Sequence, residues 1–217
     1  MKINKQLVEN LREDYRASTL EIEKVAKNPI HQFEIWFNEA LNSAIKEPNA
    51  MTLATIGLDA RPSARIVLLK GFDEQGFIFY TNSDSQKGKE LAYNPNVALV
   101  FLWKELERQV RIEGIAQKCS VEHSAAYFSS RPKGSQIGAW ASPQSQPILD
   151  RKELEDTYAN LEKQYMNQAS VPKPPHWGGY QISPRRIEFW QGRSSRLHDR
   201  INYILRGEEW SLERLAP

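Results

Sequence analysis

The chain has 217 residues and a formal net charge of +2, with hydrophobic residues at 40% and charged residues at 26%. These proportions are ordinary for a globular protein with a full core, and so small a net charge gives by itself no indication of a nucleic-acid or membrane binder. The single cysteine, Cys119, excludes an internal disulfide and any multi-cysteine metal site, which fits a reducing compartment.

No targeting or membrane-spanning pattern is visible in the sequence. The first twelve residues are polar and mixed in charge, without the apolar core of a signal peptide. The longest apolar runs, around Ile66–Leu69 and Val97–Trp103, have the length of a strand and are too short to cross a bilayer. We therefore expect a cytoplasmic protein.

The first half of the chain predicts one helix followed by strands. Residues 1–29 are charged and weakly periodic, and we expect an N-terminal extension that could be partly mobile. From Pro29 onward apolar residues recur at helical spacing, and proline suits a first helical turn. Short runs rich in Val, Ile, Leu, Thr and aromatic residues then predict strands at Met51–Gly57, Ser63–Lys70, Gly76–Thr81, Asn96–Trp103 and Arg108–Ala116.

Turn and cap residues separate these elements. Asp73–Gly76 joins two predicted strands across a short loop and is typical of a hairpin. Ser83–Ser85 offers N-cap candidates for a helix over Gln86–Tyr93, which Asn94 and Pro95 end.

The second half of the chain predicts a helical region and then more strands. The helices are expected at Val121–Ser129, Ser135–Ala141 and Asp150–Gln168, with Pro172–Pro175 as a rigid linker, and the strands at Gly178–Ile182, Arg186–Gln191, Asp199–Leu205 and Trp210–Arg214. Successive strands with few long helices between them predict an antiparallel sheet closed into a barrel of six or more strands. The expected fold class is mainly β with peripheral helices (α+β).

Four groups of basic residues lie at strand ends or at junctions between loops and helices. They are Arg65–Lys70, Tyr80–Lys87, Tyr127–Ser135 and Glu188–Arg200. The second group leads into a helix start, where free N–H groups and the helix dipole favour a phosphate. Each group alone is explained by surface cations or an ordinary helix cap. Four such groups in a chain of almost no net charge predict two separate phosphate sites.

The group at Glu188–Arg200 has the most unusual composition, with three arginines, one histidine, one tryptophan and two carboxylates. Arginine presents forked donors that match phosphate, and histidine exchanges a proton near neutral pH. Together with a flat aromatic ring, these residues favour a phosphorylated, ring-shaped small molecule.

Other chemistries have little support. The sequence contains no Walker loop, no dinucleotide fingerprint and no Gly-x-Ser-x-Gly nucleophile turn. The four histidines, His31, His123, His176 and His198, are scattered without metal-ligand spacing, so we expect no metal site.

Several motifs carry a family resemblance. They are Arg65–Phe72, Phe79–Ser83, Arg108–Gly114, Ser130–Gly138, Trp177–Tyr180, Glu188–Gly192, Arg196–Arg200 and the closing Glu213–Pro217. Together they resemble the pyridoxamine (pyridoxine) 5′-phosphate oxidase family from about residue 30 to the last residue. Arg-Leu-His-Asp-Arg and the final Arg-Leu-Ala-Pro are the most specific of them.

The resemblance implies an FMN-binding split β-barrel over residues 30–217 that works as a homodimer, with the flavin in a cleft between subunits. It implies the oxidation of pyridoxine 5′-phosphate and pyridoxamine 5′-phosphate to pyridoxal 5′-phosphate, in vitamin B6 metabolism. Dioxygen is the electron acceptor and becomes hydrogen peroxide, and the amine substrate also releases ammonia. No nucleic acid or membrane partner is implied.

The resemblance also assigns residues. Those that match substrate-phosphate positions are Lys70, Tyr127, Arg131 and Ser135, and those at the pyridine ring, with catalytic roles, are Arg196 and His198. The positions that match FMN contacts are Arg65, Ile66, Val67, Leu68, Tyr80, Thr81, Gln86, Lys87, Gln109, Gln144, Ser145, Trp190 and Arg200, with Gln144 and Ser145 expected to act across the dimer interface.

One residue departs from the family pattern, because Gln86 stands where many relatives carry arginine. A neutral amide forms weaker hydrogen bonds to phosphate than a guanidinium does, so we expect somewhat weaker FMN affinity without loss of flavin.

Three alternatives stay open at this point. The first is a split-barrel FMN protein, or flavin reductase, that acts on another substrate, although the intact substrate set argues against it. The second is a non-enzymatic binder of pyridoxal phosphate. The third is an RNA binder that uses the arginines and aromatic rings of Trp190–Arg200, which the near-balanced charge disfavours.

Overall fold

The computed structural model describes residues 5–11 and 13–217, and these residues form two compact units. Unit 1 comprises the described residues up to Pro48, together with Phe101–Arg111 and Arg186–Pro217. Unit 2 comprises Asn49–Val100 and Ile112–Arg185. Three strands, β5, β6 and β7, begin in one unit and end in the other.

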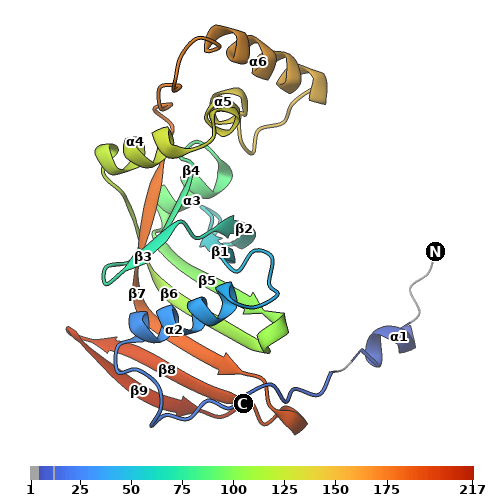
Figure 1. Ribbon diagram of the computed structural model, residues 1–217, viewed down its shortest axis with the longest axis vertical. Helices are drawn as coiled ribbons and strands as arrows, with labels where there is room; N and C mark the ends of the chain where they lie inside the picture. Colours follow the sequence, from blue (N-terminus) through green and yellow to red (C-terminus); the bar gives the residue numbers. More distant parts are fainter. Residues whose placement is uncertain (1–4, 12) are drawn as a thin grey trace. The chain divides into compact units, whose positions relative to one another are not determined.

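Antiparallel strands run through both units, with helices placed between them in the chain (Figure 1). The strands are β1 (Ala50–Ile56), β2 (Pro62–Leu68), β3 (Gly71–Asp73), β4 (Gly76–Asn82), β5 (Asn96–Trp103), β6 (Arg108–Lys118), β7 (Trp177–Gln191), β8 (Asp199–Arg206) and β9 (Glu209–Leu215). The helices are α1 (Lys5–Glu9), α2 (Pro29–Leu41), α3 (Gln86–Tyr93), α4 (Val121–Ser130), α5 (Lys133–Ala141) and α6 (Arg151–Gln164), with 3₁₀ turns η1 (Lys104–Leu106) and η2 (Ser194–Arg196).

The sheet follows the strand order β2-β1-β5-β6-β7-β4-β3, and β8 pairs with both β7 and β9. Along β1 buried and partly exposed residues alternate, which is the period-2 pattern of a sheet with one face on a core. The core of unit 2 contains fully buried side chains such as Leu53, Phe79 and Ile182. The prediction of a mainly antiparallel β fold with peripheral helices is confirmed.

Two predicted strand boundaries were wrong, each for a local reason. The runs predicted as separate strands at 178–182 and 186–191 form one strand, β7. It pairs with β4 as far as Ile182 and with β8 from Arg186 onward. Pro184, which has no N–H to donate, lies between these two stretches, so it marks a change of partner rather than a strand end.

The strand predicted at 63–70 ends two residues earlier than expected. β2 ends at Leu68, and Gly71–Asp73 forms the short β3, which pairs with β4 in the predicted hairpin. Lys70 lies between the two strands and its backbone N–H donates to the Ile78 carbonyl at 2.8 Å.

Within unit 1, α2 and the chain before it pack on the strands of that unit. Asn28 caps α2 by accepting from the Ile30 N–H at 2.7 Å, and the helix buries Phe33 and Trp36. The segment before α2 is held in the same unit by several hydrogen bonds. The Leu20 N–H donates to Asp199 at 3.1 Å, and the Tyr203 hydroxyl donates to the Ala26 carbonyl at 2.7 Å.

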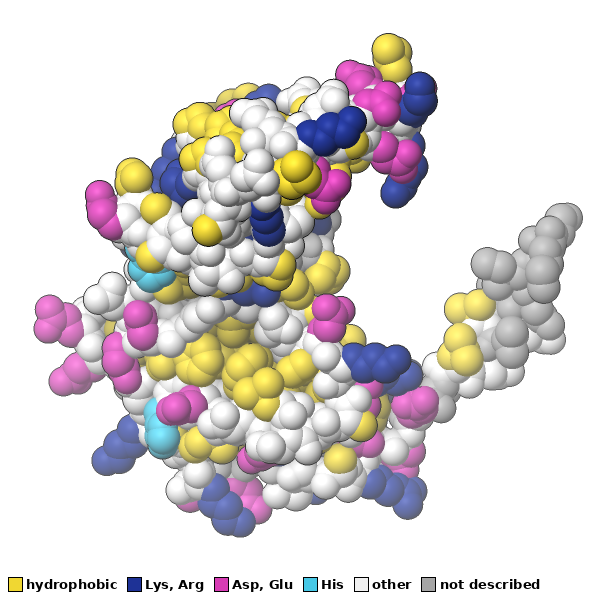
Figure 2. Space-filling model, turned by 45° about the horizontal axis from the view of Figure 1, so that its top comes forward, with side chains coloured by type: hydrophobic (Ala, Val, Ile, Leu, Met, Phe, Trp, Pro, Cys, Tyr) yellow, Lys and Arg dark blue, Asp and Glu magenta, His cyan; other side chains and the backbone are white. Residues whose placement is uncertain are grey.

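Within unit 2, α5 and α6 lie side by side (Figure 1) over a small core of their own, in which Ile137, Tyr165 and Val171 are buried. Figure 2 shows that hydrophobic side chains also appear on the surface among the charged ones. The large exposed apolar residues of unit 2 include Leu58, Ile66 and Tyr93. Among the helices that the structure describes, none is both long enough and apolar enough for a bilayer crossing.

Gly76 at the β3–β4 hairpin is a position where only glycine fits. Its φ of +129° lies in the left-handed half of the map, and a Cβ there would lie 1.9 Å from the Ile182 carbonyl oxygen. Gly76→Ala is therefore expected to lower the free energy of unfolding by at least about 2 kcal/mol, measured by urea titration.

The matched control is Gly138→Ala in the interior of α5, where an added Cβ has no heavy atom within 4 Å. Alanine is the better helix former, so this variant should be neutral or stabilising by up to about 1 kcal/mol. Equal stability of the two variants would contradict the assignment of strain to position 76.

Candidate functional site

A cavity of about 470 Å³ lies within unit 2, between strands of the sheet and the start of the helical region. It brings together residues from three of the four basic groups. The predicted site residues that line it are Ile66, Val67, Leu68, Lys70, Tyr80, Thr81, Lys87, Tyr127, Arg131, Ser135 and Gln144. Seven of the residues predicted for FMN and all four predicted for the substrate phosphate thus line one cavity.

Positive charge without a matching carboxylate distinguishes this cavity. Lys70, Lys87 and Arg131 line it, and none of the described residues that line it is aspartate or glutamate. Arginine and lysine at this density, partly removed from water, favour an anionic ligand.

Arg131 is the clearest sign of such a ligand. Its guanidinium lies over the Trp177 ring at 4.9 Å and over the Phe128 ring at 5.5 Å. Its Nη1 is buried and has no hydrogen-bond partner among the described residues. Burial lowers the pKa of the Arg131 guanidinium. An unpaired buried donor costs about 1–3 kcal/mol. An anion that accepts a hydrogen bond from Nη1 would remove this cost, and the gain would contribute to the free energy of its binding.

Lys133, which is close to Arg131 in the sequence, does not join it. Its Nζ donates to the carbonyls of Met166 and Gln168 at 3.0 and 2.8 Å, and it does not line this cavity. Of the two cations in Tyr127–Ser135, only Arg131 therefore lines this cavity.

Three stacked aromatic rings form one wall of the cavity. The Tyr80 ring lies 4.0 Å from Tyr127 and 5.1 Å from Trp177, with interplanar angles of 15° and 6°. Burial, and to a lesser extent Cys119 and Tyr127, raises the pKa of Tyr80 to about 12, so its phenol stays neutral near pH 7. A flat apolar wall beside cations suits a planar ring that bears a phosphate.

Lys87 lies at the start of α3, where Ser85 is the N-cap and accepts from the Gly88 N–H at 3.3 Å. The Lys87 Nζ donates to the Gln144 side-chain oxygen at 3.0 Å and to the Thr81 hydroxyl at 3.2 Å. Burial and the nearby charge of Arg65 lower the pKa of Lys87, and the negative charge of Glu90 offsets part of this lowering. Because these acceptors are neutral, the ammonium charge is available to an anion.

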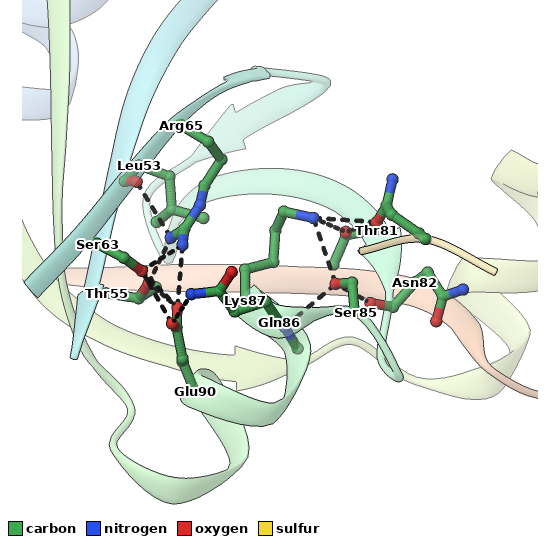
Figure 3. A network of polar contacts seen from close by, with 12 residues as sticks. Leu53, Thr55, Ser63, Arg65, Thr81, Asn82, Ser85, Gln86, Lys87 and Glu90 are labelled. Atoms are coloured by element: carbon green, nitrogen blue, oxygen red, sulfur yellow. Dashed lines mark hydrogen bonds and ion pairs between the residues drawn. The ribbon is translucent and has the colours of Figure 1, made fainter. Parts of the chain in front are cut away.

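Arg65, Gln86 and Ser145 do not line the cavity. Arg65 and Gln86 both donate to Glu90 of α3 (Figure 3), through Nη2 at 3.0 Å and Nε2 at 2.8 Å. Ser145 is exposed and has a φ of 70°.

The remaining predicted residues, Gln109, Trp190, Arg196, His198 and Arg200, belong to unit 1. There Trp190 pairs with Arg200 across β7 and β8, and the Trp190 and His198 rings lie 4.6 Å apart. Arg200 donates to both carboxylate oxygens of Glu188, at 2.8 and 3.1 Å. Arg200 is thus held by a buried carboxylate of its own unit.

The structure defines the tautomer of His198 and the backbone conformation of Arg196. The His198 Nδ1 accepts from the Arg193 backbone N–H at 3.1 Å, so any ring proton lies on Nε2. Burial, followed by the charge of Arg196, lowers the pKa of His198 and favours the neutral ring near pH 7. Arg196 and Ser195 both have left-handed backbone, with φ of 62° and 56°. Strain of this kind in two consecutive residues is common at functional sites.

Comparison with known proteins identifies the family of the chain. The sequence model described as pyridoxamine 5′-phosphate oxidase matches residues 37–190, and the one described as the pyridoxine 5′-phosphate oxidase C-terminal dimerisation region matches residues 177–217. The chain belongs to the pyridoxamine 5′-phosphate oxidase family.

Two curated relatives illustrate how similar the chain is to this family. A pyridoxine/pyridoxamine 5′-phosphate oxidase of Acaryochloris marina is 59% identical over 97% of this chain and 95% of its own length. A protein of the same name from Synechocystis is 54% identical over 96% of this chain and 97% of its own length.

Solved structures show the same fold. PhzG from Burkholderia lata, solved in complex with tetrahydrophenazine-1-carboxylic acid, superposes with a TM-score of 0.88 at 30% identity, over 94% of this chain and all of that one. An FMN-binding protein related to pyridoxamine 5′-phosphate oxidase from Nostoc punctiforme gives a TM-score of 0.68 at 18% identity, over 85% of this chain and 97% of that one. The expected split-barrel class is confirmed.

Sequence reasoning missed two residues that contact predicted site residues. Glu90 was not considered, although its i,i+4 spacing from Gln86 on a predicted helix was a usable signal. Tyr15 lies 5.8 Å from the Trp190 ring and 6.0 Å from the His198 ring. It lies in a stretch without periodicity, so the sequence gave no signal for it.

Glu90 generates a prediction on acid stability. Burial alone would raise the pKa of this carboxyl, but the hydroxyl, amide and guanidinium donors around it outweigh burial and lower the pKa to about 2 from an ordinary 4.5. A lowered folded-state pKa contributes stability above about pH 4.5 that is lost as the pH falls toward 2. Glu90→Gln is therefore expected to cost on the order of 1–3 kcal/mol of unfolding free energy at pH 7 and much less near pH 3, in urea titrations of the apoprotein.

The control is Glu122→Gln, which removes an exposed carboxylate at the start of α4. Its stability should follow that of the unaltered chain across the same pH range. If Glu90→Gln lowers the free energy of unfolding by the same amount at pH 7 and at pH 3, the stabilisation does not depend on ionisation of the Glu90 carboxyl, and the prediction is wrong.

Proposed function

We propose that this chain oxidises pyridoxine 5′-phosphate and pyridoxamine 5′-phosphate to pyridoxal 5′-phosphate, with FMN as cofactor and dioxygen as electron acceptor. Hydrogen peroxide is produced, and the amine also releases ammonia. The carrying observation is the cavity of unit 2, in which three cations and no carboxylate stand beside a stack of aromatic rings. The relatives that share more than half of the sequence carry this activity in their names.

The residues present fit FMN. Lys87 and the Thr81 hydroxyl offer donors for its phosphate at the start of α3, where the helix dipole also favours an anion. Ile66–Leu68 supply a backbone edge and apolar side chains for a flat ring system. The redox chemistry of the reaction comes from FMN when it is bound, and dioxygen takes up the two electrons.

The protein itself binds and orients the substrate. Arg131 holds the substrate phosphate with its unpaired Nη1, and Lys70, Tyr127 and Ser135 complete the set. Arg196 and His198 contact the pyridine ring, the former with fixed charge and the latter with the Nε2 of a neutral imidazole. Holding the substrate in a reactive orientation removes much of the entropic cost of the reaction.

The protein acts as a homodimer in the cytoplasm. The matched dimerisation region at 177–217 supports the dimer, as do large exposed apolar side chains such as Ile66 and Leu102. The single cysteine, with no disulfide, suits a reducing compartment.

The direct test is an aerobic assay of the purified protein. It should show a flavin absorbance spectrum, and added pyridoxine 5′-phosphate should yield aldehyde and peroxide in equal amounts. Unphosphorylated pyridoxine should react with a kcat/KM at least about 100-fold lower, because charge-assisted contacts to the phosphate are lost. Tight binding of pyridoxal phosphate without oxygen consumption would favour a carrier protein instead.

Arg196 gives a second test. Arg196→Ala should keep the bound FMN and its spectrum but lower kcat/KM by about 100-fold or more, because the substrate ring is no longer held in place. The matched control is Arg206→Ala, which removes an exposed arginine at the end of β8. Near-normal turnover of Arg196→Ala, or loss of its flavin, would refute the role proposed for Arg196.

A further inference from the structure

Glu90 lies at the centre of a buried polar network that joins α3 to the β1–β2 ladder (Figure 3). The Ser63 hydroxyl lies within 2.8 and 2.9 Å of its two oxygens, and the Thr55 hydroxyl also contacts the carboxylate. Thr55 and Ser63 are register partners on β1 and β2, so the carboxylate spans both strands. Its side chain is only 9% exposed.

Arg65 is committed to this network. Its Nη2 donates to Glu90 and to the Ser63 hydroxyl, and its Nη1 donates to the Thr55 hydroxyl and to the Leu53 carbonyl. The Arg65 side chain is 20% exposed, so water screens the pair only weakly. In the ligand-free chain, Glu90 is therefore the counter-ion of Arg65.

The neighbouring residues of α3 face two different environments. Gln86, one turn before Glu90, donates to this carboxylate, whereas Lys87 lines the cavity and donates only to neutral oxygens. Arg65 and Gln86 are two of the positions at which the family resemblance places FMN contacts, and in this structure both donate to Glu90. Glu90 also acts on the cavity through its charge. Burial and Arg65 lower the pKa of Lys87, and Glu90 raises it in part.

We propose that Glu90 is an internal counter-ion that weakens the binding of the FMN phosphate, because it holds Arg65 and Gln86 and adds a negative charge beside the anion site. This inference rests on the proposed function, since it concerns the same cofactor. Glu90 is a positioning residue, as it acts through Arg65, Gln86 and the local potential. The carboxyl stays ionised throughout the neutral range, so its effect is a fixed tuning of affinity.

The test compares Glu90→Gln with the unaltered chain by titration of each apoprotein with FMN and with riboflavin, followed by flavin fluorescence. Glutamine keeps the shape and an acceptor for Arg65 but removes the charge. The dissociation constant for FMN should fall roughly tenfold, as expected for one unit charge several ångströms from a phosphate in a partly buried site. Riboflavin, which has no phosphate, should bind both proteins equally.

Glu122→Gln is the matched control and should leave both constants unchanged, since it removes an exposed carboxylate outside the network. Unchanged or weaker FMN binding by Glu90→Gln would overturn the proposal, and so would equal tightening of riboflavin. If the unaltered chain binds neither flavin, the proposed function itself fails, and this inference with it.

Thermal unfolding provides a second measurement that does not need a stable apoprotein. Loss of the counter-ion leaves the charge of Arg65 without compensation, so FMN should raise the Tm of Glu90→Gln more than that of the unaltered chain. If Glu90→Gln folds only when FMN is bound, its stability depends on FMN even more strongly, which would also support the proposal. A variant that is equally unstable with and without FMN would contradict it.

Discussion

Uncompensated positive charge in the cavity of unit 2 is the constraint on which the rest of the site depends. Lys70, Lys87 and Arg131 line it, no carboxylate among the described residues does, and one buried donor of Arg131 has no hydrogen-bond partner among them. A protein pays for such an arrangement in stability, since each unpaired buried donor costs about 1–3 kcal/mol. The aromatic rings beneath Arg131 offset part of that cost, because cation–π contacts contribute about 0.5–2 kcal/mol.

The same electrostatic problem is solved differently a few residues away. Arg65 also lies in a partly buried position, but Glu90 neutralises it and three neutral oxygens complete its hydrogen bonds. The chain thus contains two kinds of buried cation, one kind paired internally and the other left for a ligand. Helical geometry separates them, because Gln86 and Glu90 lie one turn apart on the same face of α3 while Lys87 lies about 100° away.

Much of this fold was accessible from sequence, because its strands alternate and its turns carry specific residues. The Asp73–Gly76 hairpin and the caps of α3 were predicted from such local signals. The boundaries at Pro184 and Leu68 were not, since a strand that changes partner has no distinct local pattern. For the site, motifs identified eleven of the sixteen described residues that line the cavity. They could not show that Arg65 donates to Glu90, because that pairing depends on how α3 packs on β1 and β2.

Family membership and physical geometry therefore answer different questions about this chain. The family resemblance is the basis on which we propose residues for FMN and for the phosphorylated substrate, but it treats each position as equivalent in all relatives. At position 86 this chain has an amide, and four residues later a carboxylate accepts from it and from Arg65. An arginine at position 86 would itself pair with that carboxylate, so residues 86 and 90 have to be considered together. The affinity of the site for phosphate is set by the sum of charges around α3, and Glu90 is the negative member of that sum.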